Sequence, residues 1–571
     1  MLDIKPLQRQ FLPVDLKIDN WETLAPYAQQ LLERDISTRD DFDKFMRDES
    51  EFGAAVNEEE MWRYVRNSRY THDEAAKKAY DDYVAFISPQ LSEWGNAINQ
   101  KILASPFIEQ PQDEAERLLF RRLKQEASMF RSENVPLQTE LMQLVSQTNE
   151  VRGAMSVVLD GETMTLPQAN QRLFWPDRAK REEAWRAINA RRLQDKETFD
   201  DIFDQMVKKR HQMALNAGYK NFRDYQHDAY LRFDYTPEDC YKFHEAVEKH
   251  ILPILAHMNK KRAGQMKLDV LKPWDLACDT FGRPALKAFD GADDMVDKGI
   301  AVLDAIDPMF GDVVRAQRDM DRLDLASRPH KRPGAYNASM NESHVAFMFA
   351  NATSTVDDAS TFIHEAGHAT HDILKSRLPL GAYKVVGMEI AEVASMTMEL
   401  FAFDQWPVFF SDTEECKRAQ EEFISFILVM FPWMAQIDAI QHEFYLKPEM
   451  TPEERNDAWH AIARRFSVEG VDYSEFTPGY RTQWQKQGHV FEDPFYYIEY
   501  AIAQLGALQL WRNYQRDPVK TIAQYKAALA LGGTKSLPEL YETAGIKFDF
   551  SPAMLAELTP FLMEQMARFE S

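Results

Sequence analysis

The sequence predicts a mainly α-helical protein with two helical lobes and a small β-sheet. Most of the chain places apolar residues at intervals of three and four with charged residues between them, which is typical of amphipathic helices. Runs with the pattern of a β-strand are few and short. The 571 residues also exceed what one hydrophobic core serves, because single cores stop growing at roughly 250–300 residues. We therefore expect an N-terminal helical lobe over residues 1–190 and a larger lobe over residues 191–571.

Helical periodicity is clearest in residues 21–36, 73–102 and 177–219. The last of these segments ends on Gly218, a residue type that commonly closes a helix. Two segments have strand character instead. Residues 155–166 carry β-branched residues on both sides of Asp160-Gly161, which predicts a hairpin. Residues 343–353, "SHVAFMFANAT", read as a strand just before a cluster of histidines, so we expect a small sheet beside that cluster.

The composition excludes several classes of protein. Hydrophobic residues make up 45% of the chain and aromatic residues 12%, so the chain has ample material for packed cores. The formal net charge of −24 opposes binding to nucleic acid or to an anionic membrane. We therefore expect neither partner. The sequence carries no signal for an oligomeric state.

Three features predict a cytoplasmic protein. The cysteines Cys240, Cys278 and Cys416 lie far apart with no C-x-x-C spacing, which suggests neither a disulfide framework nor a cysteine-based zinc site. The first twenty residues are charged throughout and lack the apolar region of a signal peptide. The longest apolar run, residues 423–437, is too short to span a bilayer and contains Pro432.

The most informative stretch is residues 361–373, "TFIHEAGHATHDI". On a helix, His364 and His368 are four residues apart and project from one face, so both imidazoles can bind one metal ion. With Glu365 they form the H-E-x-x-H motif, which supplies two zinc ligands and a general base for hydrolysis. We expect a helix over residues 359–374. Gly367 costs about 1 kcal/mol in its interior, which suggests that another backbone passes close by.

The motif needs a third ligand, and several residues could provide it. His371 shares the face of the two histidines, but three ligands on one helix rarely close a tetrahedral site. The metzincin pattern is excluded because it requires a histidine at position 374, where this chain has Leu374.

A carboxylate from a second helix is the other option. Residues 387–403, "GMEIAEVASMTMELFAF", read as a buried helix that carries Glu389, Glu392 and Glu399. Acidic side chains are seldom buried unless they are paired or bind a metal. The three lie broadly on one face of the helix, and their spacing alone does not choose among them.

The histidine motif followed by "EIAEVASMTMEL" resembles the M3 metallopeptidases, the family of thimet oligopeptidase and oligoendopeptidase F. Further segments are similar to oligoendopeptidase F, among them "KRPGAY", "AGYKNFRDY", "HVFEDPFYYIEYAIAQLGALQLW" and "GGTKSLPELYETAGIKFDF". The resemblance covers roughly residues 170–560. It implies a two-lobed helical fold with a deep substrate channel, a small sheet next to the H-E-x-x-H helix, and a catalytic lobe over residues 191–571.

The resemblance also chooses the third ligand. The family pattern E-x-x-S-x-x-x-E matches this chain from Glu392 to Glu399, which makes Glu392 the ligand. Glu399 then orients a ligand histidine by accepting its other N–H, as second carboxylates at zinc sites do. Glu389 becomes a residue of the rim or of a salt bridge. His371 becomes a neighbour of the site and not a ligand.

The family further implies donors for the oxyanion that forms on the attacked carbonyl. A late histidine and a pair of tyrosines contact the substrate carbonyl in this family, and they map onto His489, Tyr497 and Tyr500, with Tyr496 as the rival tyrosine. Pro494, just upstream of these tyrosines, suits the first position of a helix. The register of this segment is set only to within one residue.

The sequence therefore predicts a zinc endopeptidase with one Zn²⁺ per chain that cleaves short, unfolded peptides. Glu365 takes a proton from zinc-bound water and later passes it to the leaving amine. Residues 344–353 would be the edge strand on which the peptide lies. Two alternatives remain: a helical H-E-x-x-H carboxypeptidase, and a catalytically inert helical protein that binds peptides.

Overall fold

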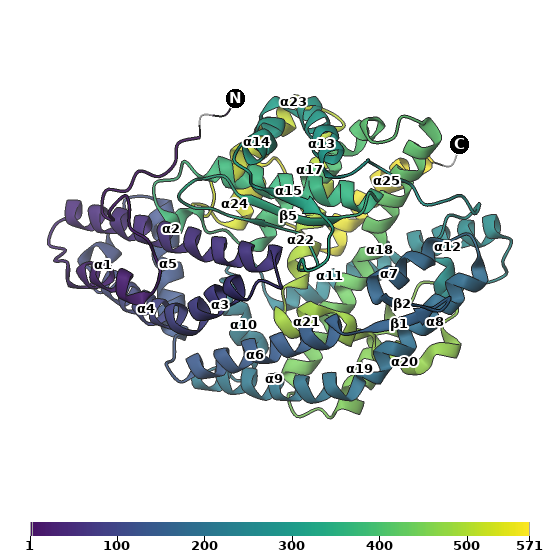
Figure 1. Ribbon diagram of the computed structural model, residues 1–571, viewed down its shortest axis with the longest axis horizontal. Helices are drawn as coiled ribbons and strands as arrows, with labels where there is room; N and C mark the ends of the chain where they lie inside the picture. Colours follow the sequence, from purple (N-terminus) through teal and green to yellow (C-terminus); the bar gives the residue numbers. More distant parts are fainter. Residues whose placement is uncertain (1, 3, 570–571) are drawn as a thin grey trace. The chain divides into compact units, whose positions relative to one another are not determined.

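The computed structural model describes residue 2 and residues 4–569, which form mostly helices with two small β-sheets (Figure 1). The predicted mainly α-helical fold is confirmed. The chain divides into two compact units, each built from three stretches. Unit 1 contains the chain up to Phe130, Lys287–Gln420 and Ala503–Phe548, and unit 2 contains Arg131–Leu286, Glu421–Ile502 and the chain from Asp549. This division differs from the expected lobes 1–190 and 191–571, which stay a prediction about sequence domains.

The main elements of unit 1 are α1 (Trp21–Glu33), α2 (Arg39–Arg69), α3 (Glu74–Asp82), α4 (Ser88–Leu103), α5 (Glu114–Met129), α13 (Ala292–Ile306), α14 (Pro308–Asp319), β3 (Leu323–Ala326), β4 (Tyr336–Ala338), β5 (Phe347–Ala352), α15 (Val356–Lys375), α16 (Gly381–Lys384), α17 (Met388–Ala402), α23 (Pro518–Ala530) and α24 (Leu537–Thr543). The main elements of unit 2 are α6 (Asn134–Gly153), β1 (Ser156–Leu159), β2 (Glu162–Thr165), α7 (Leu166–Gln171), α8 (Arg178–Gln194), α9 (Lys196–Asn216), α10 (Phe222–Ala229), α11 (Pro237–His250), α12 (Leu252–Met266), α19 (Pro452–Arg465), α20 (Thr477–Arg481), α21 (Gly488–Glu492) and α25 (Pro552–Ala567). Two helices, α18 (Thr413–Leu446) and α22 (Tyr497–Tyr514), contain a division point between the units.

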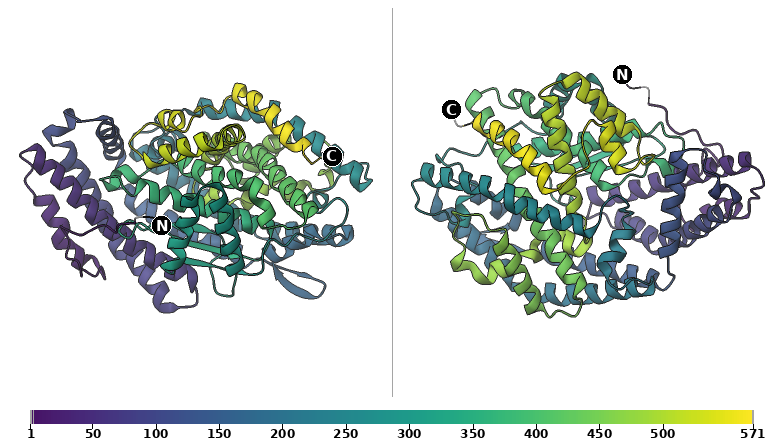
Figure 2. Two further views of the ribbon diagram at one scale, coloured as in Figure 1. Left: turned by 90° about the horizontal axis from the view of Figure 1, so that it is seen from above. Right: turned by 180° about the vertical axis from the view of Figure 1, so that it is seen from behind.

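The first five helices of unit 1 pack together as one bundle, purple to blue in both views of Figure 2. Its apolar core includes Phe42, Phe45 and Phe52 of α2 and Phe120 of α5. The rings of Phe42 and Phe120 meet edge to face, with centroids 6.1 Å apart. The helical periodicity of residues 21–36 reflects a face of α1 that is buried in this bundle. In residues 73–102 the buried positions begin at Tyr83, because α3 itself has no buried residue.

The sheet of unit 1 has the strand order β3-β5-β4. The central strand β5 runs parallel to β3 and antiparallel to β4. The expectation that residues 344–353 form an edge strand for a peptide is therefore wrong. The first four residues of β5 are all buried, and a continuous apolar run of this kind is typical of a strand covered on both faces.

Helix α2 packs directly on this sheet. Val65 is buried in a cluster with Phe347 and Phe349 of β5, and the Trp62 ring meets Phe347 edge to face at 5.9 Å. The Glu58 carboxylate accepts hydrogen bonds from the backbone N–H groups of Glu342 and the next residue, both at 2.8 Å. Helix α2 therefore contributes to two apolar clusters, the core of the N-terminal bundle and the cluster on the sheet.

In unit 2, the predicted hairpin is confirmed. Strands β1 and β2 pair antiparallel, and Asp160 and Gly161 turn the chain with φ of 53° and 81°. Positive φ at both positions is the geometry of a two-residue hairpin turn, which Asp-Gly favours. The predicted helix over residues 177–219 is split into α8 and α9 at Asp195, and it closes on Gly218 with φ of 88°.

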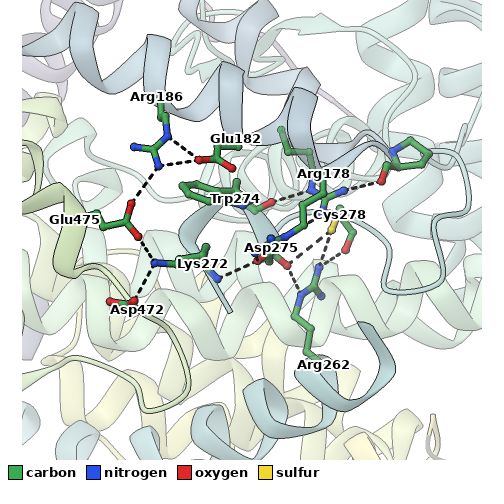
Figure 3. A network of polar contacts seen from close by, with 12 residues as sticks. Arg178, Glu182, Arg186, Arg262, Lys272, Trp274, Asp275, Cys278, Asp472 and Glu475 are labelled. Atoms are coloured by element: carbon green, nitrogen blue, oxygen red, sulfur yellow. Dashed lines mark hydrogen bonds and ion pairs between the residues drawn. The ribbon is translucent and has the colours of Figure 1, made fainter. Parts of the chain in front are cut away.

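A network of charges fixes the loop that follows α12 in unit 2 (Figure 3). Asp275 is fully buried and accepts two hydrogen bonds from Arg178, at 2.9 and 2.8 Å, and one from Arg181 at 3.1 Å. Buried carboxylates persist only when they are paired in this way. Lys272 extends the network to Asp472 at 2.9 Å.

Helix α18 is the one helix in the described part of the chain that is long and apolar enough to cross a membrane by length and composition. The sequence suggested that the apolar run at residues 423–437 is too short to span a bilayer. The helix that contains this run is longer than the run itself, 34 residues with Pro432 inside, so the length argument does not hold. Of the most apolar window, 61% is buried. Core helices pass the same test, so a single such helix is weak evidence for a membrane span.

Candidate active site

The H-E-x-x-H motif lies on α15, which begins at a capping box. The Thr355 side chain caps the helix and the Asp358 carboxylate accepts the N–H of Thr355 at 2.9 Å. The helix packs against α17 and the sheet, as Figure 1 shows. Gly367 makes the contact with α17 possible, because a Cβ there would lie 2.6 Å from Ser395 Cα and 2.8 Å from the Ala394 carbonyl oxygen. The expected close backbone approach at Gly367 is confirmed.

The two helices bring His364, His368 and Glu392 together. Their ligand atoms all lie within 4.8 Å of one another. Glu392 Oε2 is 3.4 Å from His364 Nε2 and 3.7 Å from His368 Nε2. The two imidazole rings stand nearly perpendicular, at 82°, with centroids 4.9 Å apart. Two nitrogens and one carboxylate oxygen thus face a common point.

Further side chains hold these three in place. Glu399 Oε1 lies 2.7 Å from His364 Nδ1, which is the contact expected for Glu399. The other Glu399 oxygen accepts a hydrogen bond from Ser360 at 2.6 Å. Ser395 donates to Glu392 Oε2 at 3.0 Å. Such outer hydrogen bonds fix the tautomer and orientation of a metal ligand.

Glu365 lies on α15 between the two histidines in sequence and is only 6% exposed. Its Oε2 atom has no hydrogen-bond partner. Burial raises the pKa of Glu365 to about 7, and the Glu392 and Glu399 carboxylates act in the same direction. An unpartnered buried carboxylate oxygen is costly and is retained where chemistry needs it.

The electrostatics of the three clustered residues favour a positive charge between them. Burial acts to lower the pKa of His364, but contacts with Glu392 and Glu399 outweigh it and raise that pKa well above its ordinary value. Burial likewise acts to raise the pKa of Glu392, but His364 and His368 lower it to about 2. Burial lowers the pKa of His368 to about 4, so this imidazole is neutral at pH 7 and has a lone pair to offer.

The residues present fit a catalytic metal ion of the zinc type. Two histidines and one glutamate are a donor set that zinc hydrolases use, and a set of three leaves one coordination position open. All three side chains come from rigid helices, and the close packing at Gly367 fixes the distance between them. The unpartnered Glu365 oxygen lies on the same helix as two of the donors.

Two other residues of the motif region are placed as follows. His371 is buried, its Nε2 atom has no hydrogen-bond partner, and it is not part of the three-residue group. Burial lowers its pKa well below the ordinary value. Glu389 is only 3% exposed, which excludes the rim position, while its expected alternative role in a salt bridge stays a prediction. The helix turns it inward because it shares the buried face of α17.

The predicted oxyanion donors gather in unit 2, on α21 and at the start of α22. The His489 ring stacks on Tyr496 at 5.6 Å and meets Tyr497 and Tyr500 edge to face at 5.1 and 5.8 Å. His489 Nδ1 lies 2.8 Å from Gln487 Nε2. Tyr497 is 7% exposed, whereas Tyr496 and Tyr500 are half-buried.

Pro494 does not begin the helix that carries these tyrosines, so that expectation is wrong. Helix α22 begins at Tyr497, three residues later. Phe495 interrupts the backbone with φ of 69°, in the left-handed region, and a hydrogen bond of 2.8 Å from its N–H to Gln441 Oε1 holds it there. The sequence gives no signal for this tertiary contact.

One set of hydrogen bonds beside the motif was not predicted from the sequence. Asp372, one turn after His368, accepts hydrogen bonds from Asn337 at 3.0 Å and from Ser339 at 2.7 Å. These contacts attach α15 to β4 and the residue that follows it. The partners are more than thirty residues away in the chain, so no local pattern predicts them.

Known proteins share both the sequence pattern and the fold. The sequence model of the family described as Peptidase family M3 matches residues 174–288 and 300–560. The sequence model of the Peptidase M3 N-terminal domain matches residues 11–130. A solved structure of PZ peptidase A with an inhibitor is similar with a TM-score of 0.89 and 26% identity, over 97% of this chain and 99% of that one.

Relatives known from sequence are oligopeptidases. The group B oligopeptidase PepB of Streptococcus agalactiae is 24% identical over 56% of this chain and 53% of its own length. The plasmid oligoendopeptidase F of Lactococcus lactis subsp. cremoris is 24% identical over 65% of this chain and 61% of its own length. The chain thus spans between half and two thirds of the length of these relatives.

Proposed function

Because the chain belongs to peptidase family M3, we propose that it is a zinc-dependent endopeptidase that hydrolyses short, unfolded peptides. The observation that carries the proposal is the group of His364, His368 and Glu392, with the buried Glu365 carboxylate on the same helix. In this proposal the group holds one Zn²⁺. The names of the relatives, oligopeptidase and oligoendopeptidase, support short peptides as substrates.

Each residue has a chemical role in this proposal. When bound, the metal supplies Lewis acidity, which polarises the peptide carbonyl and lets water ionise near neutral pH. Glu365 accepts a proton from the attacking water and donates it to the leaving amine, for which a pKa of about 7 is well suited. Glu399 holds His364 in position through Nδ1.

His489, Tyr497 and Tyr500 donate hydrogen bonds to the carbonyl oxygen as it gains charge. Their gathering around one imidazole supports a common role. Tyr496 belongs to the same cluster and remains the rival of Tyr497. The half-buried phenols of Tyr496 and Tyr500 are more accessible to a substrate than that of Tyr497.

A cytoplasmic location completes the proposal. All three cysteines are free thiols and all are buried. Free thiols and the absence of a disulfide among the described residues suit a reducing compartment. The net charge of −24 opposes association with nucleic acid or an anionic membrane surface.

The test is cleavage of an internally quenched peptide with an amidated C-terminus by the zinc-loaded chain. We expect cleavage at an internal bond. Replacing Glu365 by Gln should lower kcat by about 10²–10⁴-fold, the range for loss of a general base. Metal content should stay unchanged in this variant, because Glu365 is not a ligand. The exposed substitution Glu414→Gln is the control and should leave the rate unchanged.

Three results would contradict parts of the proposal. A strict carboxypeptidase leaves the amidated peptide intact and cleaves only the free-acid form. A peptide-binding protein without activity binds the peptide and cleaves neither form. An unchanged rate in the Glu365→Gln variant excludes Glu365 as the base.

A further inference from the structure

A second cluster of metal-binding residue types lies in unit 2, between α11 and α18. Cys240 and His244 are four residues apart on α11, and Asp438 and His442 are four residues apart on α18. Residues at this spacing lie on one face of a helix. The two pairs face each other, because His244 Nε2 and His442 Nε2 both contact Asp438 Oδ2, at 2.8 and 3.1 Å.

The geometry suits three ligands for one ion. A sulfur atom of Cys240, a carboxylate oxygen of Asp438 and a ring nitrogen of His442 all lie within 4.8 Å of one another. The distance of 3.1 Å between His442 Nε2 and Asp438 Oδ2 is close to the separation of about 3.3 Å between two ligand atoms in a tetrahedral zinc site.

Burial separates this cluster from an ordinary group of surface residues. Cys240 and Asp438 are at most 1% exposed and His442 is 3% exposed. The second carboxylate oxygen, Asp438 Oδ1, is buried without a hydrogen-bond partner. A buried carboxylate with one unpartnered oxygen is costly, and a cation is the partner that it favours most.

Charge balance supports the same conclusion. A divalent ion bound by one thiolate, one carboxylate and a neutral imidazole gives a group with no net charge, which is the least costly state in a buried site. Binding would release the Cys240 thiol proton to solvent, as thiol ligands do. The Tyr241 hydroxyl oxygen lies 3.3 Å from His442 Nδ1 and can accept its N–H, which leaves the lone pair of Nε2 for a metal.

We propose that Cys240, Asp438 and His442 form a second metal site that takes a zinc-type divalent ion, with His244 positioning the Asp438 carboxylate. The ion cross-links α11 to α18. No residue of this site belongs to the H-E-x-x-H group, so the site does not depend on the proposed peptidase activity. Its sequence signal is C-x-x-x-H and D-x-x-x-H on two distant helices, and neither half resembles a zinc motif alone.

The thiolate allows a direct test, because the His364, His368 and Glu392 group contains no sulfur. The full chain is produced in medium supplemented with cobalt, and its absorption spectrum is recorded. We expect a near-ultraviolet charge-transfer band from thiolate to Co²⁺ in the wild-type chain. The band should persist in His368→Ala, which removes an active-site ligand, and disappear in Cys240→Ser.

Cys278→Ser is the matched control, since Cys278 is a buried cysteine of the same unit that contacts Arg262 and lies outside the cluster (Figure 3). Its band should equal that of the wild type. Metal analysis should give about two ions per wild-type chain and about one in either His368→Ala or Cys240→Ser. Circular dichroism shows whether each variant is folded.

Two outcomes overturn the proposal. The first is a cobalt-loaded wild-type chain without the thiolate band, a result that does not depend on how Cys240→Ser folds. The second is a band that persists in folded Cys240→Ser, which would assign the thiolate to another cysteine. Loss of peptide cleavage in His368→Ala with the band retained supports both sites independently.

Discussion

Glu399 holds one of the proposed metal ligands without belonging to the three-residue group itself. Its Oε1 atom lies 2.7 Å from His364 Nδ1, and its Oε2 atom accepts a hydrogen bond from the Ser360 hydroxyl at 2.6 Å. Both carboxylate oxygens thus have a partner. A carboxylate in this position raises the basicity of the imidazole and fixes the nitrogen that faces the metal. The E-x-x-S-x-x-x-E pattern marks this residue in the sequence, but only the folded chain shows which histidine it holds.

Replacing Glu399 by Gln should weaken metal binding by about 10–100-fold, the usual cost of losing such a partner. Ser360→Ala removes only the hydrogen bond to Glu399 and should therefore weaken metal binding by a smaller factor. Competition with a chromophoric chelator measures the affinity of each chain. The exposed Glu414→Gln substitution should bind metal like the wild type. Equal affinities in Glu399→Gln and wild type would show that Glu399 does not act through His364.

At the scale of elements, the contact between α15 and α17 sets the geometry of the proposed metal ligands. A methyl group at Gly367 would meet Ser395 Cα at 2.6 Å and the Ala394 carbonyl oxygen at 2.8 Å. That carbonyl already accepts a hydrogen bond of 2.7 Å from Tyr525, so the backbone of α17 has little freedom to move away. The two helices that carry His364, His368 and Glu392, the proposed ligands, are therefore held at one separation.

Gly367→Ala should lower the free energy of unfolding by about 1–3 kcal/mol, the cost of overpacking, and should also weaken metal binding. Gly53→Ala is the matched control, because Gly53 lies inside helix α2 with no atom within 4 Å of the added Cβ. This control should be neutral or stabilising by up to about 1 kcal/mol. Chemical denaturation measures both. Similar stabilities for the two variants would contradict the close contact.

One acid of β3, Asp324, adds an ion pair to the contacts between the N-terminal bundle and the sheet. Burial acts to raise the pKa of Asp324, but hydrogen bonds from Arg328, Lys331 and Arg69 hold it well below its usual range. Arg69 comes from α2 and donates at 2.8 Å, and Lys331 donates at 2.9 Å with a fully buried side chain. Loss of Asp324 would leave the Lys331 charge buried without its acid.

Asp324→Asn should lower the free energy of unfolding by about 3 kcal/mol at pH 7, the cost of breaking a buried ion pair. Because the folded pKa is depressed, the carboxylate stabilises the fold above its unfolded pKa, and this contribution is lost as the pH falls below about 5. The difference from wild type should therefore shrink in acid. The exposed Asp290→Asn serves as control. A difference that stays constant from pH 7 to pH 3 would exclude this role for the charge.

At the scale of the whole molecule, the H-E-x-x-H motif lies in a unit that draws on three separate stretches of chain. The helical class, the hairpin at Asp160-Gly161 and the helix of the motif could all be predicted, because each depends on local periodicity or turn chemistry. The central position of β5 in the sheet could not be predicted from the sequence, because its pairing with β3 and β4 is a long-range property.

Prediction of the site from the sequence was incomplete for the same reason, because the site depends on contacts between distant parts of the chain. Spacing identified His364 and His368, whereas the choice of Glu392 over Glu389 and Glu399 required a family resemblance. The cluster around Cys240 escaped detection because its two halves are about two hundred residues apart in sequence. Residue patterns within one helix are visible in a sequence, and the pairing of two helix faces becomes visible only in the fold.

Anomalous diffraction at the zinc absorption edge, from crystals of the zinc-loaded chain, tests the central claim most directly. We predict a peak about 2.0–2.2 Å from His364 Nε2, His368 Nε2 and a Glu392 oxygen, with Glu365 close to the open coordination position. A zinc-loaded, folded chain with no anomalous peak among these three residues would contradict the account.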